Sequence, residues 1–392
     1  MIKEKYKILY ISPSTLFLNF ANEIQVLNMC SAFNKLNYDV VLFANIKNKL
    51  INLKYISNHY GINTSKLKIN SITLNIQKGV EFFIFIKSLL FYFKNYLNFK
   101  KKYKVYSRNI FSTFFFGVLL NLEIIYECHS IERGYRGYLQ SKIIRKSNIK
   151  VICISNALKK IFLNQFKEKK KLSVNIFVCH DASNDDVNIL TDNMKIIERT
   201  RKLSIHKSNF NKKFAGYFGG LYQGRGIHLL IEVAKLTKDV LFLIFGGDQD
   251  TISKLRNSKL PGNFILMGFV NPSESKFYMS MMDVLLMPYQ KKVSIGVKDI
   301  NTSKWMSPLK MFEYMSTGVP IIASDIKVLK EVLKHNKNSL LVDPENPKKW
   351  SDYVKRVIYD KKLSKNLSTN ALINLRDNYT WTKRAKFILS LF

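Results

Sequence analysis

Short apolar runs alternate with stretches of helical spacing from the start of the chain. The run Lys7–Ser12 ends in polar turn residues, which predicts a buried strand. Apolar positions three and four residues apart follow over Glu23–Lys35 and predict a helix, and Asp39–Ala44 predicts the next strand. A strand, a helix and a strand in this order form a βαβ unit, whose two strands lie parallel in one sheet.

The same alternation continues through two series of predicted strands. A helix begins after Ser155, a good N-cap residue, and another spans Gly226–Lys235. Residues 181–213 are polar and form the best candidate linker. The pattern therefore predicts two doubly wound α/β domains, residues 1–190 and residues 191–375. The remaining predicted strands are Lys104–Ser107, Glu123–Glu127, Lys150–Ile154, Asn175–Val178, Phe214–Phe218, Val240–Phe245, Phe264–Met267, Val284–Met287, Pro320–Ala323 and Ser339–Val342.

The cellular compartment follows from the apolar runs and the cysteines. The stretches Gly79–Phe93 and Ile110–Leu120 are both shorter than the roughly 18 uninterrupted apolar residues of a spanning helix, so no transmembrane segment is predicted. The chain opens with a strand-like run rather than a secretory signal. No two of the four cysteines form a C-x-x-C pair, so we expect reduced core residues in the cytoplasm. They are Cys30, Cys128, Cys153 and Cys179.

The charge balance changes the list of expected partners. The sequence holds 63 Lys and Arg against 28 Asp and Glu, a formal net charge of +35, which attracts nucleic acid, anionic lipid or phosphorylated substrates. A bias of the coding sequence toward Lys, Asn, Ile and Phe is the alternative explanation. Aromatic residues and lysines mix over Phe93–Lys104 and predict a basic amphipathic helix that lies on an anionic membrane, with a solvated helix face as the alternative.

The strongest local signal is the stretch Ser307–Pro320. Ser307 suits an N-cap and Pro308 the first helical position, while Gly318 suits the position after the helix. These residues predict a helix of about ten residues. Its first turn presents free N–H groups and the positive end of the helix dipole, which is a natural phosphate site.

Two charged side chains of this helix share a face. Lys310 and Glu313 lie three residues apart, so Glu313 is one turn below the expected phosphate. A carboxylate at that depth can accept hydrogen bonds from both hydroxyls of a ribose. The alternative is a surface Lys–Glu pair on a well-capped helix.

A glycine-rich turn provides the second signal. Gly219–Gly226 follows the predicted strand Phe214–Phe218 and precedes a helix, which lets the backbone approach a phosphate. Within it, Arg225 has the geometry for a bidentate contact with a diphosphate. The turn has neither the Walker A nor the G-x-G-x-x-G spacing, so an ordinary glycine-rich turn is the alternative.

Together these stretches resemble the family-4 (group 1) glycosyltransferases, whose GT-B fold consists of two Rossmann-like domains. The order and spacing of the matching segments agree over about 130 residues, and the first half matches more loosely. The segment Tyr379–Ala385 looks like the family's closing helix, so residues from about 376 to 392 are expected to join the first domain. The matching segments are Tyr217–Leu230, Phe245–Asp248, Met267–Val270, Met282–Tyr289, Ser307–Asp325 and Asn338–Val342, and, in the first half, Glu23–Val26, Tyr126–His129 and Ile154–Leu158.

The resemblance implies roles for individual residues. Glu313 would hold the donor ribose, the Leu309–Lys310 backbone with Arg225 the diphosphate, and Phe269 with Val270 would lie beside the base. His129 would contact the transferred sugar. The implied donor-binding set is Gly220, Leu221, Arg225, Phe269, Val270, Ser307, Leu309, Lys310 and Glu313, and the implied catalytic set is His129, Arg225 and Lys310.

Two positions depart from the family pattern. Many members have a further glutamate eight residues before Glu313, where this chain has Trp305, which leaves the contacts to the donor sugar open. The basic residue beside the diphosphate is often lysine and is Arg225 here, which preserves the charge.

The resemblance implies a retaining transferase that moves a sugar from a nucleoside-diphosphate donor to a glycan or glycolipid acceptor, in bacterial surface polysaccharide synthesis. No cofactor or metal ion is expected; Asp248 and Asp250 fall where the family has a turn. One alternative is a GT-B-fold isomerase of nucleotide sugars. The other is a basic nucleic-acid-binding protein, although no nucleic-acid-binding motif is present.

Overall fold

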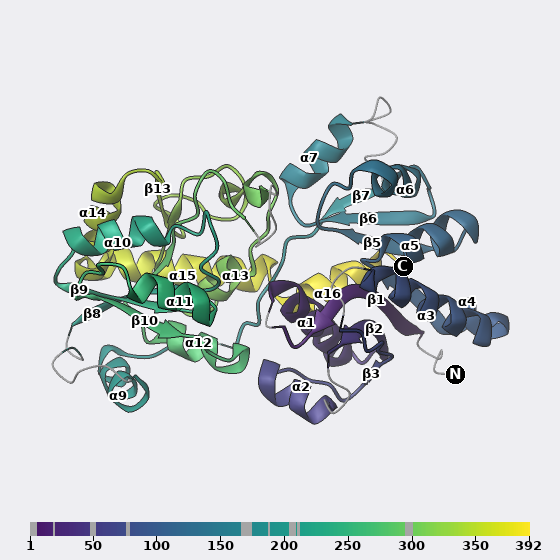
Figure 1. Cartoon of the computed structure of the whole chain (residues 1–392), viewed down its shortest axis with the longest axis horizontal. Helices are drawn as coiled ribbons and strands as arrows, with labels where there is room; N and C mark the ends of the chain where they lie inside the picture. Colours follow the sequence, from purple (N-terminus) through teal and green to yellow (C-terminus); the bar gives the residue numbers. More distant parts are fainter. Residues whose placement is uncertain are drawn as a thin grey trace. The chain divides into compact units, whose positions relative to one another are not determined.

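The computed structural model describes residues 6–18, 20–47, 52–75, 79–165, 175–186, 189–203, 209, 212–294 and 301–392. The chain divides into two compact units (Figure 1). Unit 1 consists of Met1–Asp181 and Trp381–Phe392, and unit 2 of Ala182–Thr380. The sequence predicted these boundaries near residues 190 and 376.

Unit 1 is built on a seven-stranded parallel sheet in the order β3-β2-β1-β4-β5-β6-β7. β1 pairs on both sides, with Tyr10 opposite Leu42 of β2 and opposite Tyr106 of β4. All seven residues of β2 are buried, as expected for a strand that is covered on both faces. The strands are β1 Lys7–Leu16, β2 Val40–Ile46, β3 Leu67–Ile69, β4 Tyr103–Ser107, β5 Ile124–Cys128, β6 Ile149–Cys153 and β7 Ile176–Val178.

The helices of unit 1 cover both faces of its sheet, as the connections between parallel strands require (Figure 1). α3 packs on β1 and β2 through Ile84 and Tyr92, whereas α16, the last helix of the chain, packs against α1. They are α1 Ala21–Lys35, α2 Leu53–Tyr60, α3 Val80–Lys94, α4 Phe99–Lys102, α5 Ile110–Thr113, α6 Gly134–Ile144, α7 Asn156–Asn164 and α16 Trp381–Ser390, with the short turns η1 Tyr96–Asn98 and η2 Phe114–Leu119.

Unit 2 is built on a six-stranded parallel sheet in the order β10-β9-β8-β11-β12-β13. Its core lies between this sheet and helices α10 and α14, where the fully buried Trp350 donates from its indole nitrogen to the Asp343 carbonyl at 3.0 Å. The strands are β8 Lys213–Phe218, β9 Val240–Phe245, β10 Phe264–Gly268, β11 Val284–Met287, β12 Ile321–Ser324 and β13 Leu340–Val342. The helices are α9 Asp192–Lys202, α10 Ile227–Leu236, α11 Gln249–Arg256, α12 Pro272–Ser280, α13 Leu309–Met315, α14 Pro347–Tyr359 and α15 Lys361–Asn378, with η4 Thr302–Lys304 and η5 Leu329–Glu331.

The predicted architecture of two doubly wound parallel sheets is confirmed. Ser155 caps α7 as predicted, since its side chain accepts a hydrogen bond from the Leu158 N–H at 3.0 Å. The polar stretch 181–213 contains α9, whose buried Arg199 donates to Asp283 at 2.8 Å.

Two local predictions are wrong. Ser307 is not the N-cap: Pro308 is, with no side-chain cap, and α13 spans seven residues rather than about ten. Gly318 has the left-handed conformation that was expected (φ 71°), but the helix ends earlier, at Met315. The segment Phe93–Lys104 is not one amphipathic helix, because α3 ends at Lys94 and η1, α4 and the start of β4 follow.

Among the residues that the structure describes, no helix has both the length and the apolar character that crossing a bilayer demands.

Three glycines of unit 2 give a test of the packing. A Cβ on Gly226, at φ 83°, would lie 1.9 Å from the Pro288 carbonyl oxygen. Gly268 has a similar φ of 80° with open space around its Cβ position, and Gly262 has open space and no positive φ. We expect Gly226→Ala to lower the free energy of unfolding by at least about 2 kcal/mol, Gly268→Ala by about 1 kcal/mol, and Gly262→Ala to leave it nearly unchanged. Urea denaturation measures all three, and equal midpoints would contradict the close approach at Gly226.

Candidate functional site

Two glycine turns meet at the carboxyl edge of the unit 2 sheet. β8 and β9 end in register, with Phe218 opposite Phe245, and each strand is followed by a glycine with positive φ. A Cβ on Gly246 would lie 2.3 Å from the carbonyl oxygen of Gly219, so the turns can touch only as glycines. Ligands of doubly wound sheets bind at this edge, which makes it the first place to look for a site.

The loop after β8 directs Arg225 toward the sheet edge. Arg225 lies between Gly224 and Gly226. A Cβ on Gly224 would collide with the backbone of Lys292, and one on Gly226 with the backbone of Pro288. The Arg225 Nη1 donates to the Tyr289 hydroxyl at 2.7 Å, and the guanidinium lies 5.0 Å from the centre of the Tyr289 ring.

Helix α13 brings a second cation to the same place. Tyr314 fixes this helix on the sheet, because its hydroxyl accepts from the Phe218 N–H at 2.9 Å and donates to the Leu286 carbonyl at 3.3 Å. Lys310, one turn earlier, places its Nζ 3.6 Å from the centre of the Tyr217 ring. A Cβ on Gly219 would come within 3.0 Å of that Nζ, so the lysine lies directly on the glycine turn.

The two cations form no ion pair in the part of the chain that the structure describes, although the Glu313 carboxylate is an electrostatic neighbour of Lys310. Lys310 is 8% exposed, and neither its Nζ nor the buried Arg225 Nε has a hydrogen-bond partner there. Burial, and then the neighbouring Arg225, lower the pKa of Lys310 well below its usual value. A buried lysine and a half-buried arginine, each with an unsatisfied N–H group beside a glycine turn, form a site suited to an anion.

Glu313 lies on the same helix as Lys310. Burial raises the pKa of its carboxyl, while Lys310 and Lys276 act in the opposite direction. The described residues form no ion pair or hydrogen bond with this carboxylate, so its oxygens can accept hydrogen bonds from a ligand.

The other predicted donor-site residues lie around this core. Ser307 and Leu309 are buried at the start of α13, and the Gly220 carbonyl accepts from the Tyr217 hydroxyl at 2.7 Å. Leu221 packs on the turn after β9, because a Cβ on Gly247 would lie 2.6 Å from it. Phe269, which is 52% exposed, and Val270 follow β10, the outer neighbour of β9. The structure thus groups Arg225, Lys310 and Glu313 closely and places Phe269 and Val270 two strands away from β8.

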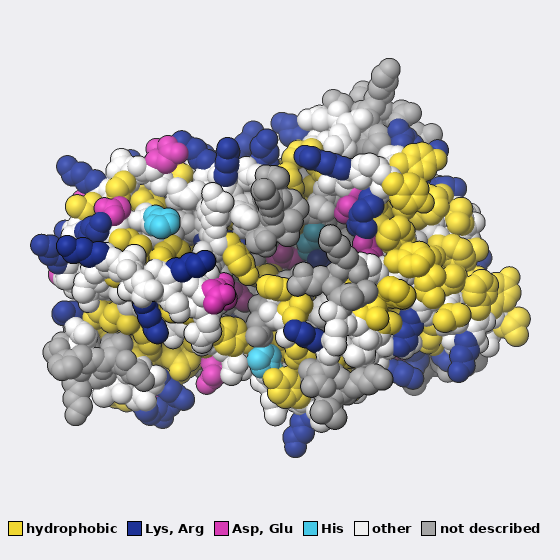
Figure 2. Space-filling model, in the orientation of Figure 1, with side chains coloured by type: hydrophobic (Ala, Val, Ile, Leu, Met, Phe, Trp, Pro, Cys, Tyr) yellow, Lys and Arg dark blue, Asp and Glu magenta, His cyan; other side chains and the backbone are white. Residues whose placement is uncertain are grey.

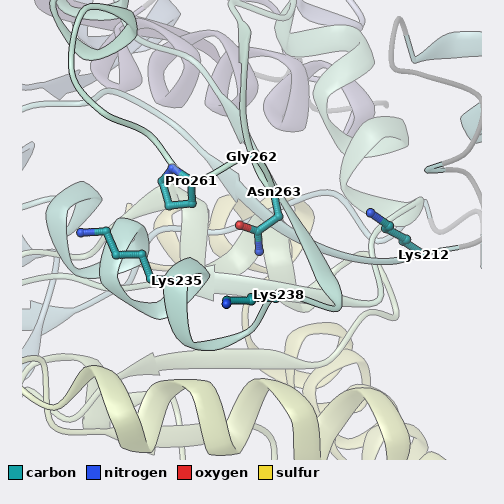
Figure 3. Close-up of a pocket in the computed structure, with 6 residues that line it drawn as sticks. All are labelled: Lys212, Lys235, Lys238, Pro261, Gly262 and Asn263. Carbon is teal, nitrogen blue, oxygen red and sulfur yellow. The ribbon is translucent and has the colours of Figure 1, made fainter.

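A basic cavity of about 400 Å³ lies elsewhere in unit 2 (Figure 3). It is lined by Lys212, Lys235, Lys238 and the segment Pro261–Asn263. Lys212 precedes β8 and the other segments precede β9 and β10, so this cavity lies at the amino ends of the strands. It is therefore at the opposite edge of the sheet from Lys310.

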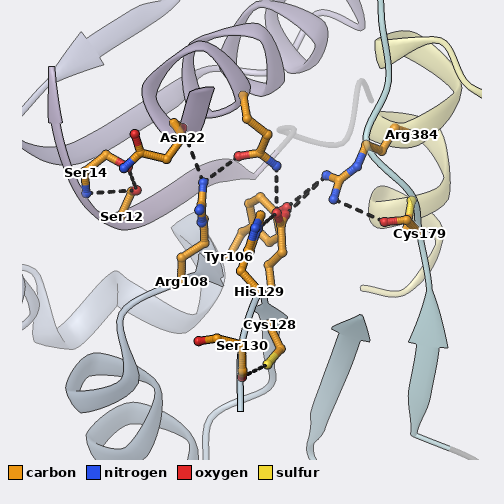
Figure 4. Close-up of polar contacts among 12 residues, drawn as sticks. Ser12, Ser14, Asn22, Tyr106, Arg108, Cys128, His129, Ser130, Cys179 and Arg384 are labelled. Atoms are coloured by element: carbon orange, nitrogen blue, oxygen red, sulfur yellow. Dashed lines mark hydrogen bonds and ion pairs between the residues drawn. The ribbon is translucent and has the colours of Figure 1, made fainter. Parts of the chain in front are cut away.

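In unit 1, His129 follows β5 at the carboxyl edge of its own sheet and belongs to a buried polar network (Figure 4). Its Nε2 contacts Oε1 of the fully buried Glu127, and the same oxygen accepts from the Gln25 side-chain amide at 2.6 Å. The other carboxylate oxygen pairs with Arg384 of α16 at 3.2 Å. Arg108 donates to Gln25 at 2.6 Å and completes the network.

The network sets the protonation of His129. Burial would raise the pKa of Glu127, but Arg384 and His129 outweigh it and lower that pKa to about 2. Burial and Arg108 lower the pKa of His129 to about 4, although Glu127 opposes them. At neutral pH the ionised Glu127 can only accept, so the neutral imidazole carries its proton on Nε2 and leaves Nδ1 as an acceptor.

Sequence reasoning found His129 but missed Glu127, Gln25, Arg108 and Arg384. The polar residues Glu127 and Gln25 stand inside apolar stretches, which is the one signal that marked them as unusual. Nothing in the sequence links Glu127 with Arg384, since they are 257 residues apart.

One family model and several known proteins are similar to this chain. The family model described as "Glycosyl transferases group 1" matches residues 198–372. The chain is 20% identical over 270 residues to spore coat protein SA of Bacillus subtilis strain 168, which covers 64% of this chain and 67% of that protein. Other curated relatives are matched over 45% to 62% of their length.

Two solved structures share the fold over nearly the whole chain. Anabaena Alr3699/HepE in complex with UDP-glucose has a TM-score of 0.70 at 14% identity, and the match covers 99% of this chain and 100% of that one. WaaG, a glycosyltransferase involved in lipopolysaccharide biosynthesis, has a TM-score of 0.65 at 10% identity and covers 98% and 99%.

The protonation of His129 can be measured. ¹⁵N NMR of histidine-labelled protein should show His129 as the neutral Nε2–H tautomer at neutral pH, titrating near pH 4 instead of the ordinary 6.5. Arg108→Gln should raise this pKa, because it removes a cation that disfavours the imidazolium. Arg133→Gln, at an exposed position of the same unit, serves as the control. An unperturbed pKa near 6.5 in the unmodified protein would contradict the network.

Proposed function

We propose that this chain is a group 1 glycosyltransferase, because the model of that family matches residues 198–372 and a solved structure with bound UDP-glucose shares its fold over nearly the whole chain. It would transfer a sugar from a nucleoside-diphosphate donor to a hydroxyl of a glycan or glycolipid acceptor, with retention of configuration. In this reaction the bond between the anomeric carbon and the diphosphate oxygen breaks, and the diphosphate leaves with the electron pair. The acceptor oxygen forms the new bond to the anomeric carbon, and its proton passes to the departing diphosphate oxygen.

The observation that carries the proposal is the pair Lys310 and Arg225, whose buried Nζ and Nε atoms have no hydrogen-bond partner among the described residues. A diphosphate offers the negative charge that both groups need, and its charge grows as the sugar departs. Preformed cations in a site shielded from water stabilise such a leaving group without any reorganisation. We propose that Lys310 and Arg225 supply this stabilisation without a resident metal ion.

The remaining donor contacts follow from the same edge of the sheet. The Glu313 carboxylate, which has Lys310 and Lys276 as electrostatic neighbours but no hydrogen bond from a described side chain, would accept hydrogen bonds from the ribose hydroxyls. Gly220, Leu221, Ser307 and Leu309 would contribute backbone groups. The exposed Phe269 ring and Val270 would pack against the base.

We assign His129 to the sugar-transfer step as a hydrogen-bond acceptor. Its neutral Nδ1 would accept from a sugar hydroxyl, a role that needs no proton transfer. Glu127 and Arg384 are positioning residues in this assignment. Glu127 contacts the imidazole, and Arg384 holds the Glu127 carboxylate.

We further propose surface polysaccharide or glycolipid synthesis as the setting, which the lipopolysaccharide role of WaaG and the spore-coat name of the relative support. All four cysteine thiols are unpaired, which favours a reducing compartment such as the cytoplasm.

Donor binding should be coupled to proton uptake at Lys310. The apo-protein pKa of Lys310 is lowered, and a bound diphosphate would raise it, so binding between those two pKa values takes up a proton. Calorimetry at mildly alkaline pH, in buffers of different ionisation enthalpy, measures the uptake with whichever of UDP, GDP or CMP raises the melting temperature most. Lys310→Met should abolish uptake and weaken binding while leaving the melting temperature unchanged or higher, since it removes an unpaired buried charge.

Matched variants sharpen this test. Arg225→Ala and Glu313→Ala should each weaken nucleotide binding by about 1.5–3 kcal/mol, the value of a charge-assisted hydrogen bond. Lys235→Met, at an exposed lysine of the same unit, should change neither affinity nor uptake. Wild-type affinity in Lys310→Met, Arg225→Ala and Glu313→Ala would rule out this donor site.

The assignment of His129 is tested by kinetics. His129→Ala should depress sugar transfer strongly while nucleotide affinity stays near that of the wild type, because Lys310, Arg225 and Glu313 all belong to unit 2. Near-normal turnover would reduce His129 to a structural role, and a large loss of stability would indicate that it mainly supports the turn after β5. Product formed without any acceptor would instead favour an isomerase.

A further inference from the structure

Helix α3 has an exposed apolar face that its packing in unit 1 does not explain. One side of the helix, with Val80, Ile84 and Tyr92, is buried against the sheet. The opposite side carries large apolar residues at helical spacing that remain open to solvent: Phe82 (49% exposed), Phe83 (46%), Leu90 (64%) and Phe93 (59%), continued in η1 by Tyr96 (61%) and Leu97 (90%). A helix that is apolar all round is normally enclosed on all sides.

The exposed face continues onto neighbouring elements. Figure 2 shows a broad apolar area over the α3, α5 and α6 side of unit 1. The Phe82 ring packs edge-on against Phe111 of α5, at 6.0 Å between centres, and Arg136 of α6 lies 5.7 Å from the Phe111 ring. On α6, Tyr135 and Tyr138 are 70% and 55% exposed, so aromatic side chains extend the face beyond α3.

The charged groups around this face are basic. Lys94, Lys100, Lys101 and Lys102 are exposed at the end of α3 and along α4. The acidic residue of α3, Glu81, is neutralised by Arg136 at 2.6 Å and also accepts from the Ile110 N–H at 2.9 Å. Lysines therefore border the apolar face, while the nearby carboxylate is already paired.

Unit 1 as a whole also has an excess of basic residues. Its sequence holds 32 Lys and Arg against 9 Asp and Glu, whereas unit 2 holds 31 against 19. The positive charge of the chain is thus concentrated on the unit that carries the exposed apolar face. A bias in composition alone would raise the charge of both units alike.

We propose that the outer face of α3 and η1, with Tyr135 and Tyr138 of α6, is a docking surface for an anionic lipid bilayer. The combination of exposed Phe and Leu, aromatic Tyr and a border of Lys matches the boundary between acyl chains and anionic headgroups. At 15 residues, or about 22 Å, α3 is too short to span, so it lies in the interface with Phe82, Leu90, Phe93 and Leu97 inserted. The lysines at its end contact the headgroups. This proposal does not depend on the transfer reaction.

Vesicle flotation tests the surface directly. The full-length protein should bind equimolar phosphatidylcholine–phosphatidylglycerol vesicles at low salt, more weakly at high salt, and at least about tenfold more weakly to phosphatidylcholine alone. Leu90→Ser with Leu97→Ser should weaken binding to the anionic vesicles by at least about tenfold, because both side chains lose their insertion energy. The matched control, Leu236→Ser with Ile373→Ser, changes two exposed apolar residues of unit 2 and should leave binding unchanged.

The charge contribution has its own pair of variants. Replacing Lys94, Lys100 and Lys101 by Gln should flatten the salt dependence, whereas replacing Lys259, Lys327 and Lys337 of unit 2 by Gln should not. Melting temperatures of all variants establish that they are folded. Absence of binding of the unmodified protein to anionic vesicles at low salt overturns the proposal. Equal binding of the Leu90→Ser, Leu97→Ser variant and its unit 2 control also overturns it. So does a concentration-dependent dimer in sedimentation velocity that Leu90→Ser with Leu97→Ser dissociates, since the face would then serve a second copy of the chain.

Discussion

Burial of the Lys310 Nζ without a hydrogen-bond partner or an ion pair among the described residues is the constraint around which the carboxyl edge of unit 2 is arranged. Removing an ammonium from water costs on the order of several kcal/mol, and only part is recovered from the Tyr217 ring beneath it. The arrangement survives because Tyr314 ties α13 to β8 and β11, and because Gly219 leaves room for the lysine. In the proposed function the donor diphosphate would supply the missing partner, so the empty state would give up stability for affinity in the bound state.

The buried charge at the carboxyl edge of the unit 1 sheet has an ion-pair partner, whereas the charges at the carboxyl edge of the unit 2 sheet have none among the described residues. In unit 1 the Glu127 carboxylate is paired by Arg384, Gln25 and His129, so its charge is fixed. Burial and Arg108 lower the pKa of the neighbouring His129, against the effect of Glu127. In unit 2 the cations have no such partner among the described residues. A network in which every polar group has a partner is suited to holding one side chain in one protonation state. A pair of cations with unsatisfied N–H groups is suited to binding a ligand.

The sequence predicted the strands well because parallel strands covered on both faces are uninterrupted apolar runs, as β2 and β9 show. It failed where tertiary contacts override local rules. Ser307 has the composition of an N-cap, but Tyr314 holds α13 in a position where the helix begins only at Leu309. The donor-site residues could be placed on adjacent turns from their motifs, but the unsatisfied Nζ of Lys310 depends on burial, which no motif encodes. The exposure of the outer face of α3 could not be predicted either, since an apolar sequence predicts burial and does not indicate which side of the helix stays exposed.

Unit 1 is assembled from two segments that are separated by all of unit 2. During synthesis the strand that carries Glu127 emerges long before α16, so its carboxylate waits without Arg384 while about 200 residues of unit 2 are made. An early fold of unit 1 would leave Glu127 with Gln25 and His129 as partners but without the guanidinium that balances its charge. The network around His129 can therefore be complete only once residue 384 has been synthesised, so the order of translation delays completion of this part of the molecule.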